Sequence, residues 1–184
     1  PSGDRYLQKV DDQLQHMSAL VNELLLFSKA SHQNQPKREP IQLADAVEAA
    51  LAHELGQEPS VHCDIPPGCS VLAVPAFLER AIANVVRNSL RYAGTEQAIE
   101  VIAKIESDSV VLRLLDSGPG VSGEALPNLF DAFYRPDPGR HSESGGTGLG
   151  LAIVKACIES CGGRVSARNR VPQGFEIRFV LERG

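Results

Sequence analysis

The stretch 144–154, SGGTGLGLAIV, decides the fold because it places four glycines at the start of an amphipathic helix. The first N–H groups of a helix have no partner within it, and they lie at the positive end of its dipole. Glycine lets an anion approach such groups closely. The stretch lacks the G-x-x-x-x-G-K-[S/T] pattern of a P-loop, so it predicts a phosphate site of another kind. A glycine-rich turn without a ligand is the plainer alternative.

The segment just upstream, residues 134–148, contains no Leu, Ile, Val, Met or Phe. Loops of this length without core contacts are usually lids or disordered segments. The apolar residues of 129–134 (LFDAFY) can anchor one end of such a lid. Arg135 and Arg140 within it are placed to reach a triphosphate, although both can equally be solvated charges.

A second informative stretch is 114–121, LLDSGPGV, in which an apolar strand ends at an acidic residue and two glycines follow. Glycine allows the backbone to come close to a ligand. The carboxylate of Asp116 can accept a hydrogen bond from an exocyclic amine, which suits adenine better than guanine. Residues 118–123 also satisfy G-x-G-x-x-G, but the preceding strand belongs to a hairpin and no βαβ unit follows, so a dinucleotide fold is rejected.

The third stretch is 83–92, ANVVRNSLRY, in which Asn84, Asn88, Arg91 and Tyr92 share one face of a helix. A carboxamide oxygen is a hard ligand that suits Mg²⁺. This face therefore indicates contact with a magnesium–phosphate group, and a polar helix surface is the equal alternative.

The pattern from residue 41 onward predicts an α+β two-layer sandwich, in which a mixed β-sheet packs against helices on one face. The apolar periodicity predicts helices at 44–55, 76–92 and 148–161, the last ending at Gly162-Gly163. It predicts strands near 60–65, 70–74, 98–106, 109–116, 164–169 and 175–182, with a hairpin turn at 107–109.

An amphipathic helix is expected over residues 5–30, because Leu7, Val10, Leu14, Met17, Val21 and Leu24 form a heptad seam. Such a seam needs partner helices, unless the helix lies on its own domain. Residues 31–40 contain two prolines and no large apolar residue, which indicates a linker. We therefore expect units at 1–31 and 41–184, joined by a linker at 32–40.

Composition narrows the classes of function. The hydrophobic fraction of 42% and the charged fraction of 22% are those of a globular protein. A net charge of −5 without a basic block argues against a nucleic-acid partner. No apolar run reaches the roughly 20 residues of a membrane span, so we expect a soluble chain. Cys157 and Cys161 are expected to be buried and reduced rather than half of a metal site.

Together with residues 130–133, the three stretches resemble the four motifs of bacterial sensor histidine kinases, whose ATP-binding domain has the Bergerat-type fold shared with gyrase, Hsp90 and MutL. In this resemblance 84–92 is the N box, 116–120 the G1 box, 130–133 the F box and 146–150 the G2 box. The wording of 143–151 is similar to the envelope-stress sensor kinases of Gram-negative bacteria, and residues 5–31 resemble the second helix of the family's dimerisation and phosphoacceptor hairpin. The resemblance implies ATP and Mg²⁺ as cofactors, with Asn88 as a magnesium ligand, Asp116 on the adenine amine and Tyr92 beside the base. The implied ATP-binding residues are Asn84, Asn88, Arg91, Tyr92, Asp116, Gly118, Gly120, Val121, Phe133, Arg135, Gly146, Thr147, Gly148, Leu149 and Gly150.

The reaction that this resemblance implies is transfer of the γ-phosphoryl group to a histidine, followed by relay to an aspartate of a response regulator. Arg91 and Arg135 are the candidates for a direct catalytic role. The resemblance implies an acceptor histidine in a His-Glu/Asp-Leu-Arg-x-Pro-like sequence, and none of the five histidines has it. His53 comes nearest, but its sequence lacks the arginine and it lies after the linker. We therefore expect a chain that binds Mg·ATP but does not phosphorylate itself, from the cytoplasmic portion of an inner-membrane sensor that dimerises through its hairpin.

Three alternatives stay open at this point. An anti-sigma serine kinase shares the ATP fold, but the heptad helix and the F box argue against it. A gyrase- or Hsp90-type ATPase normally continues into a further domain. A nucleotide-sensing or dimerisation module without kinase activity would carry the same motifs.

Overall fold

The computed structural model describes residues 17–18, 21, 23–25, 28, 30, 37–54, 61–93, 98–136 and 147–184. Along the chain the elements are β1 (Glu39–Gln42), α2 (Leu43–Glu54), β2 (Val61–Asp64), β3 (Ser70–Ala73), α3 (Pro75–Ala93), β4 (Ile99–Glu106), β5 (Ser109–Asp116), the 3₁₀ helix η1 (Leu126–Asn128), α4 (Gly150–Ser160), β6 (Arg164–Asn169) and β7 (Phe175–Glu182). Among the described residues no helix combines the length and the hydropathy that crossing a membrane requires.

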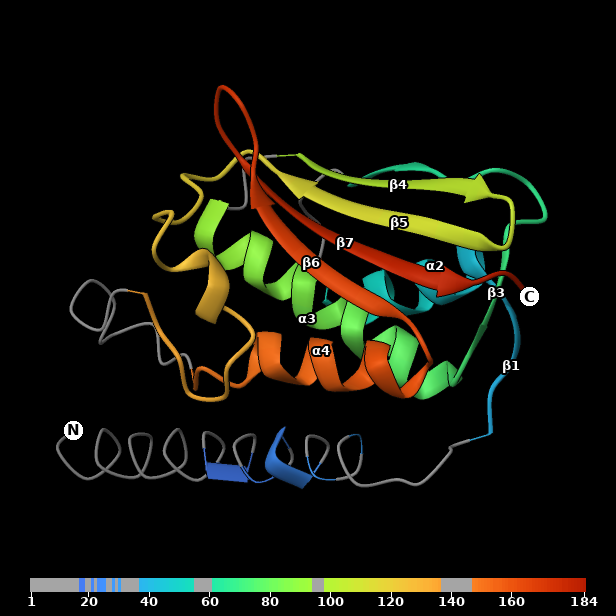
Figure 1. The fold of residues 1–184 in the computed structure, drawn as a ribbon, viewed down its shortest axis with the longest axis horizontal. Helices are drawn as coiled ribbons and strands as arrows, with labels where there is room; N and C mark the ends of the chain where they lie inside the picture. Colours follow the sequence, from blue (N-terminus) through green and yellow to red (C-terminus); the bar gives the residue numbers. More distant parts are fainter. Residues whose placement is uncertain are drawn as a thin grey trace, which may run out of the picture.

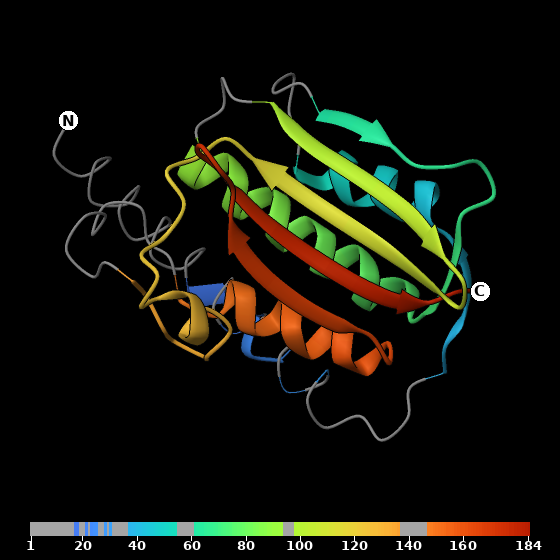
Figure 2. The same cartoon turned by 45° about the horizontal axis from the view of Figure 1, so that its top comes forward.

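The main sheet has five strands in the order β2-β4-β5-β7-β6. Only β2 and β4 run parallel, and the other neighbours are antiparallel. Helices α2, α3 and α4 all lie on one face of this sheet (Figures 1 and 2). The predicted two-layer fold with a mixed sheet is therefore confirmed, and so is the hairpin of β4 and β5, which rules out a βαβ unit at β5.

The predicted elements beyond residue 41 agree with the observed ones to within two residues, but strand β1 was not expected. It begins at Glu39, inside the segment that its composition assigns to a linker, and pairs antiparallel with β3 in a separate two-stranded sheet. Arg38, just before it, donates to Glu182 at 3.1 Å and to the carbonyl of Cys161 at 3.3 Å. These contacts tie this end of the segment to the sheet and to α4.

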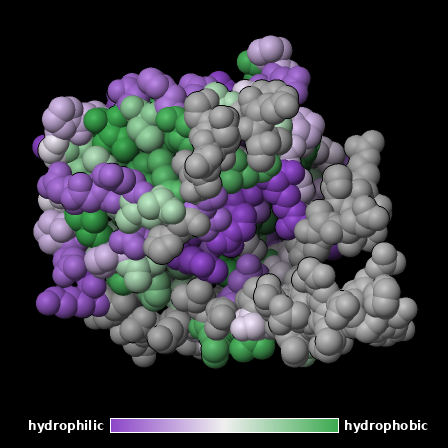
Figure 3. Space-filling view, turned by 180° about the vertical axis from the view of Figure 1, so that it is seen from behind, coloured by the Kyte–Doolittle hydropathy of each residue, from purple (hydrophilic) through white to green (hydrophobic). Residues whose placement is uncertain are grey.

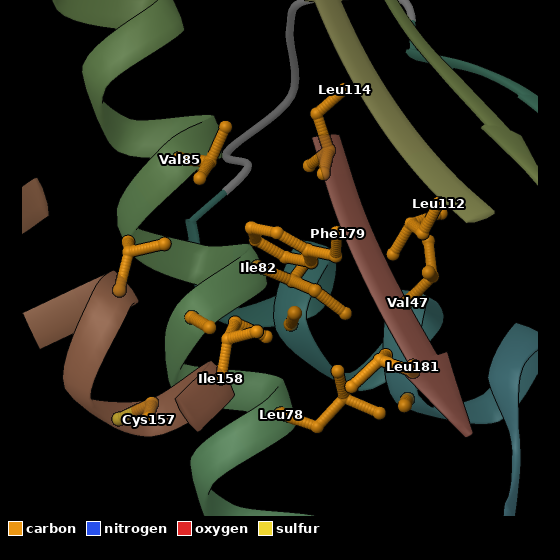
Figure 4. Close-up of a cluster of buried hydrophobic side chains, with 14 of the residues drawn as sticks. Val47, Leu78, Ile82, Val85, Leu112, Leu114, Cys157, Ile158, Phe179 and Leu181 are labelled. Carbon is orange, nitrogen blue, oxygen red and sulfur yellow. The ribbon is translucent and has the colours of Figure 1, made fainter. Parts of the chain in front are cut away.

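The core lies between the sheet and the helices. Strand β4 alternates buried and more exposed side chains, as expected for a sheet with one covered face. In Figure 4, the ring of Phe179 on β7 lies against Ile82 of α3, and side chains of α2, α4 and β5 surround the pair. Phe179 and Ile82 are fully buried. Because α3 and α4 share this core, it fixes the two helices relative to each other.

Cys157 and Cys161 belong to this core, as expected for small buried side chains. Burial raises the pKa of the Cys157 thiol to about 12, and the neighbouring Cys161 adds to the effect. The thiol is therefore neutral at physiological pH.

Glu176 is a charged residue of β7 that is buried, because it is only 1% exposed. Its Oε2 accepts hydrogen bonds from Arg113 at 2.7 Å and from Arg168 at 2.9 Å. Burial alone would raise the pKa of Glu176, but the hydrogen bonds and charges of the two arginines outweigh it and leave this pKa below its ordinary value. Glu176 thus joins strands β5, β7 and β6 as an anion.

The expected amino-terminal helix falls largely outside the described residues. Those that are described within 17–30 are helical. Met17, Val21 and Leu24 of the heptad seam are 59%, 54% and 46% exposed, so these three side chains of the seam do not pack on the rest of the fold. Figure 3 shows hydrophobic surface at its lower edge, the side on which Figure 1 places this segment. Ala30, by contrast, is buried, and its carbonyl accepts a hydrogen bond from Ser160 of α4 at 2.6 Å.

Candidate nucleotide-binding site

Helix α3 carries the two asparagines that the sequence singles out. Asn84 is 2% exposed, and its carboxamide is already engaged, because it donates to the Arg80 carbonyl at 2.9 Å and accepts from Arg87 at 3.3 Å. Arg87 in turn pairs with Glu54 of α2. Asn84 is therefore held as part of the helix packing.

Asn88 lies one turn further along α3 and is half-buried. A Cβ built on Gly150 would lie 3.6–3.7 Å from its carboxamide atoms and 3.9 Å from Oδ1 of Asn84. The start of α4 therefore faces both asparagines. The absence of a side chain at Gly150 leaves the Asn88 carboxamide accessible beside the unpaired N–H groups of that helix end.

Asp116 stands at the end of β5 and is 7% exposed. Its Oδ2 accepts a hydrogen bond from the Ser89 hydroxyl at 2.9 Å, and its Oδ1 accepts one from the Gly118 N–H at 2.9 Å. A carboxylate has about four acceptor sites, so each oxygen keeps capacity for a further donor. The carboxylate is therefore fixed in direction and still able to bind an amine.

Gly148, in the loop before α4, approaches residues 130–133 closely. Gly148 has φ +72°, and a Cβ built on it would lie 2.8 Å from backbone atoms of Phe133. The Phe133 N–H donates to the Gly148 carbonyl at 2.9 Å. Phe133 itself has φ 67°, which is rare for a bulky residue, and its side chain is 64% exposed. This contact brings residues 130–133 to the loop before α4.

Thr147 links the same loop to the amino-terminal segment. Its hydroxyl donates to the Glu23 carboxylate at 2.7 Å and accepts from the Leu149 N–H at 3.1 Å. Leu149 is fully buried and anchors the loop in the core. A carboxylate therefore lies beside the loop that leads into α4.

The remaining predicted residues divide into two groups. Arg91 and Tyr92 are exposed at the carboxyl end of α3, where the Arg91 guanidinium lies 5.7 Å from the centre of the Tyr92 ring. Arg135 is half-buried, and no ion pair is found for it within the described part of the chain. Gly146 and most of the expected lid, including Arg140, lie outside the described residues.

Sequence reasoning missed the residues that hold the site in shape. Ser89 is buried and binds Asp116, but its position one residue after Asn88 places it off the polar face used to select candidates. Asn169 binds both the N–H and the carbonyl of Val121 from a distant hairpin. A polar residue at the end of a strand, followed by a turn, was the available signal for Asn169.

Comparison with known proteins settles the family. Residues 73–184 match the family described as histidine kinase-, DNA gyrase B-, and HSP90-like ATPases. The chain belongs to this ATPase family. The matched range contains every candidate residue of α3, β5 and α4 described above.

Its similar relatives in this family are sensor histidine kinases. The chain is 36% identical to the sensor histidine kinase CpxA of Escherichia coli K12 over 182 residues, which cover 95% of this chain and 39% of that protein. It is 34% identical to CusS of the same strain over 177 residues, which cover 92% and 36%. The chain thus spans less than half the length of these curated relatives.

Two solved structures share the fold of this chain. The mycobacterial sensor histidine kinase MprB aligns with a TM-score of 0.69 and 25% identity, covering 79% of this chain and 97% of that one. Full-length ShkA, solved in complex with AMPPNP, aligns with a TM-score of 0.81 and 21% identity, covering 100% of this chain and 39% of that one.

Proposed function

We propose that residues 41–184 are the ATP-binding catalytic domain of a sensor histidine kinase. In this proposal the domain binds Mg·ATP and transfers the γ-phosphoryl group to a histidine of a phosphoacceptor helix, for relay to a response-regulator aspartate. Residues 1–31 are the second helix of the dimerisation hairpin, and residues 32–40 connect the two units. The parent is an inner-membrane sensor with this portion on the cytoplasmic side.

The observation that carries this proposal is the meeting of three segments at one place. The end of β5 presents Asp116 beside Ser89 of α3, and the start of α4 faces Asn88 of the same helix. An amine-binding carboxylate therefore lies along α3 from a metal-ligating carboxamide and an anion-binding helix start. That set of groups fits adenine, Mg²⁺ and phosphates in turn.

Each residue has a role in this scheme. Bound Mg·ATP supplies the phosphoryl group, and the chain binds and orients it. Asp116 accepts a hydrogen bond from the adenine amine. Gly118, Gly120 and Val121 line the base pocket, and Tyr92 packs beside the base. Asn88 ligates Mg²⁺, with Asn84 close by. The start of α4, with Gly146 to Gly150, binds the phosphates, and Phe133 holds that loop.

Phosphoryl transfer depends on positioning and on stabilisation of charge more than on covalent help from the protein. Arg91 and Arg135 are the cations available to stabilise the charge that develops on the phosphates.

Replacing Asp116 tests the nucleotide site directly. Asp116→Asn removes the charged acceptor, and a hydrogen bond to a charged group contributes about 1.5–3 kcal/mol, so ATP affinity should fall roughly 10- to 150-fold. The control is Asp108→Asn, because Asp108 is an exposed acidic residue in the turn at the far end of the same β-hairpin. Isothermal titration with Mg·ATP measures both, and equal affinities for the two variants would refute the assignment.

Transfer is tested separately with γ-labelled ATP and a separately prepared phosphoacceptor hairpin. A histidine kinase domain labels the hairpin with an acid-labile phosphate and leaves its own chain unlabelled. Binding of ATP without labelling of the hairpin would identify a nucleotide-binding module. Stoichiometric label on residues 1–184 alone would place an acceptor within this chain.

A further inference from the structure

The turn that follows Asp116, residues 117–121, is bound by the hairpin between β6 and β7. Figure 1 shows this hairpin, residues 169–175, rising beside the end of β5. The turn adds few side chains to the core, since Pro119 is exposed and Gly120 and Val121 are only half-buried. Its position therefore depends on hydrogen bonds to its backbone.

Side chains of the hairpin supply those hydrogen bonds. Asn169 accepts from the Val121 N–H at 2.9 Å and donates to the Val121 carbonyl at 2.7 Å. Gln173 donates to the Ser117 carbonyl at 3.2 Å, and Arg170 donates to the Asp116 carbonyl at 3.2 Å. Both ends of the turn are thus bound by one short segment.

The two backbones are also too close for side chains to separate them. A Cβ built on Gly120, which has φ +70°, would lie 2.5 Å from Oδ1 of Asn169. A Cβ built on Gly174 would lie 2.3 Å from the Asp116 carbonyl oxygen. The glycines therefore allow the hairpin to reach the turn on which the candidate adenine pocket is built.

Asn169 has the chemistry that this contact requires. A carboxamide offers a donor and an acceptor side by side, so it pairs with the N–H and C=O of one residue as a neighbouring strand would. An aspartate could accept from Val121 but could not donate to it. Asn169 is exposed, so its contribution to burial in the core is small.

We propose that the β6–β7 hairpin positions the adenine-binding turn, with Asn169 as the principal positioning residue. This inference rests on the proposed ATP site. Arg170, which also pairs with Glu100 at 3.2 Å, supports the hairpin from β4. Loosening the turn should weaken the grip on the base and leave the phosphate end, at α4, unaffected.

The test compares two probes, Mg·ATP and Mg·tripolyphosphate, which lacks a base. Asn169→Ala removes both hydrogen bonds that hold Val121, so ATP affinity should fall about tenfold while tripolyphosphate affinity stays unchanged. Asn169→Asp, which keeps only the acceptor, should give a similar loss. The matched control is Ser166→Ala, an exposed side chain on the same strand, which should change neither affinity.

Hydrogen exchange gives a second readout without any ligand. The Val121 amide should exchange faster in Asn169→Ala than in the wild type and Ser166→Ala, because its acceptor is gone. Unchanged ATP affinity in Asn169→Ala, or an equal loss for both probes, would overturn the positioning role. Failure of the wild type to bind ATP would instead refute the proposed function, so the two failures are distinguishable.

Discussion

At the scale of single residues, the direction of the Asp116 carboxylate is set by two donors on different segments. Ser89 holds Oδ2 from helix α3, and the Gly118 N–H holds Oδ1 from the turn. A buried acceptor that is held from two sides loses little entropy when it binds a further donor. The site is in this sense prepared before the nucleotide arrives.

The contribution of Ser89 can be measured by Ser89→Ala. The variant removes one hydrogen bond to a charged group and leaves a small, buried apolar side chain, so we expect ATP affinity to fall by roughly tenfold or more. The free energy of unfolding should also fall, by about 1–3 kcal/mol, because the buried Asp116 carboxylate loses one of its two donors. Titration with ATP and thermal unfolding would check this, and a variant that binds ATP as well as the wild type would show that Gly118 alone orients the carboxylate.

At the scale of elements, the loop between η1 and α4 depends on Gly148. Alanine there meets both an unfavourable φ of +72° and a contact of 2.8 Å with the Phe133 backbone. We expect Gly148→Ala to lower the free energy of unfolding by about 2–4 kcal/mol and to abolish ATP binding, because the loop must move.

Two further glycines distinguish the effect of a positive φ from the effect of a steric contact. Gly68 has φ +70° but open space around its Cβ position, so Gly68→Ala should cost only about 1 kcal/mol of strain. Gly123 has neither a positive φ nor a neighbour within 4 Å, and Gly123→Ala should be neutral. Urea unfolding of the three variants measures the series, and equal losses in all three would show that neither φ nor contact matters.

The elements that sequence predicted well are those with a buried apolar face. Helix α3 and strands β4 to β7 repeat apolar residues at the period of their structure, so their limits agree closely with the prediction. Strand β1 escaped because its four residues, EPIQ, carry one apolar side chain and end a polar segment. Strand β1 forms because it pairs with β3, and pairing with a distant strand leaves no pattern in the residues of β1 themselves.

The candidate site shows the same division. The glycines, the asparagines and Asp116 could be identified from residue type and spacing within single segments. Ser89 and Asn169 act across the fold, so their roles depend on which segments meet, and that is decided by the core packing of α3 and by the strand order. Roles of this kind can be assigned only from the three-dimensional structure.

At the scale of the whole molecule, the sheet contains a buried charge whose effect depends on pH. The pKa of Glu176 lies below its ordinary value, which is about 4.3 for a glutamate in an unfolded chain. Its contribution to stability is therefore fully present above that value and is lost as the pH falls through the lower pKa of the folded state.

Glu176→Gln should isolate this contribution. The variant keeps a similar shape but loses the charge that Arg113 and Arg168 share, so it should lower the free energy of unfolding by about 1–3 kcal/mol near pH 7. The difference from the wild type should stay constant above about pH 5 and shrink below pH 4. Urea unfolding between pH 3 and 7 measures it, and a difference that does not shrink in acid would contradict an ionised Glu176.

The hydroxyl of Thr147 can donate one hydrogen bond, and in this structure the Glu23 carboxylate accepts that bond. A phosphate oxygen that accepts this bond must displace the carboxylate, so the two acceptors compete. Competition at a single atom makes their equilibria reciprocal: each weakens the other by the same factor. In the proposed site, a phosphate bound at the loop before α4 would therefore weaken the contact between Thr147 and Glu23. One threonine would thereby couple phosphate binding to the contact between this loop and the amino-terminal segment.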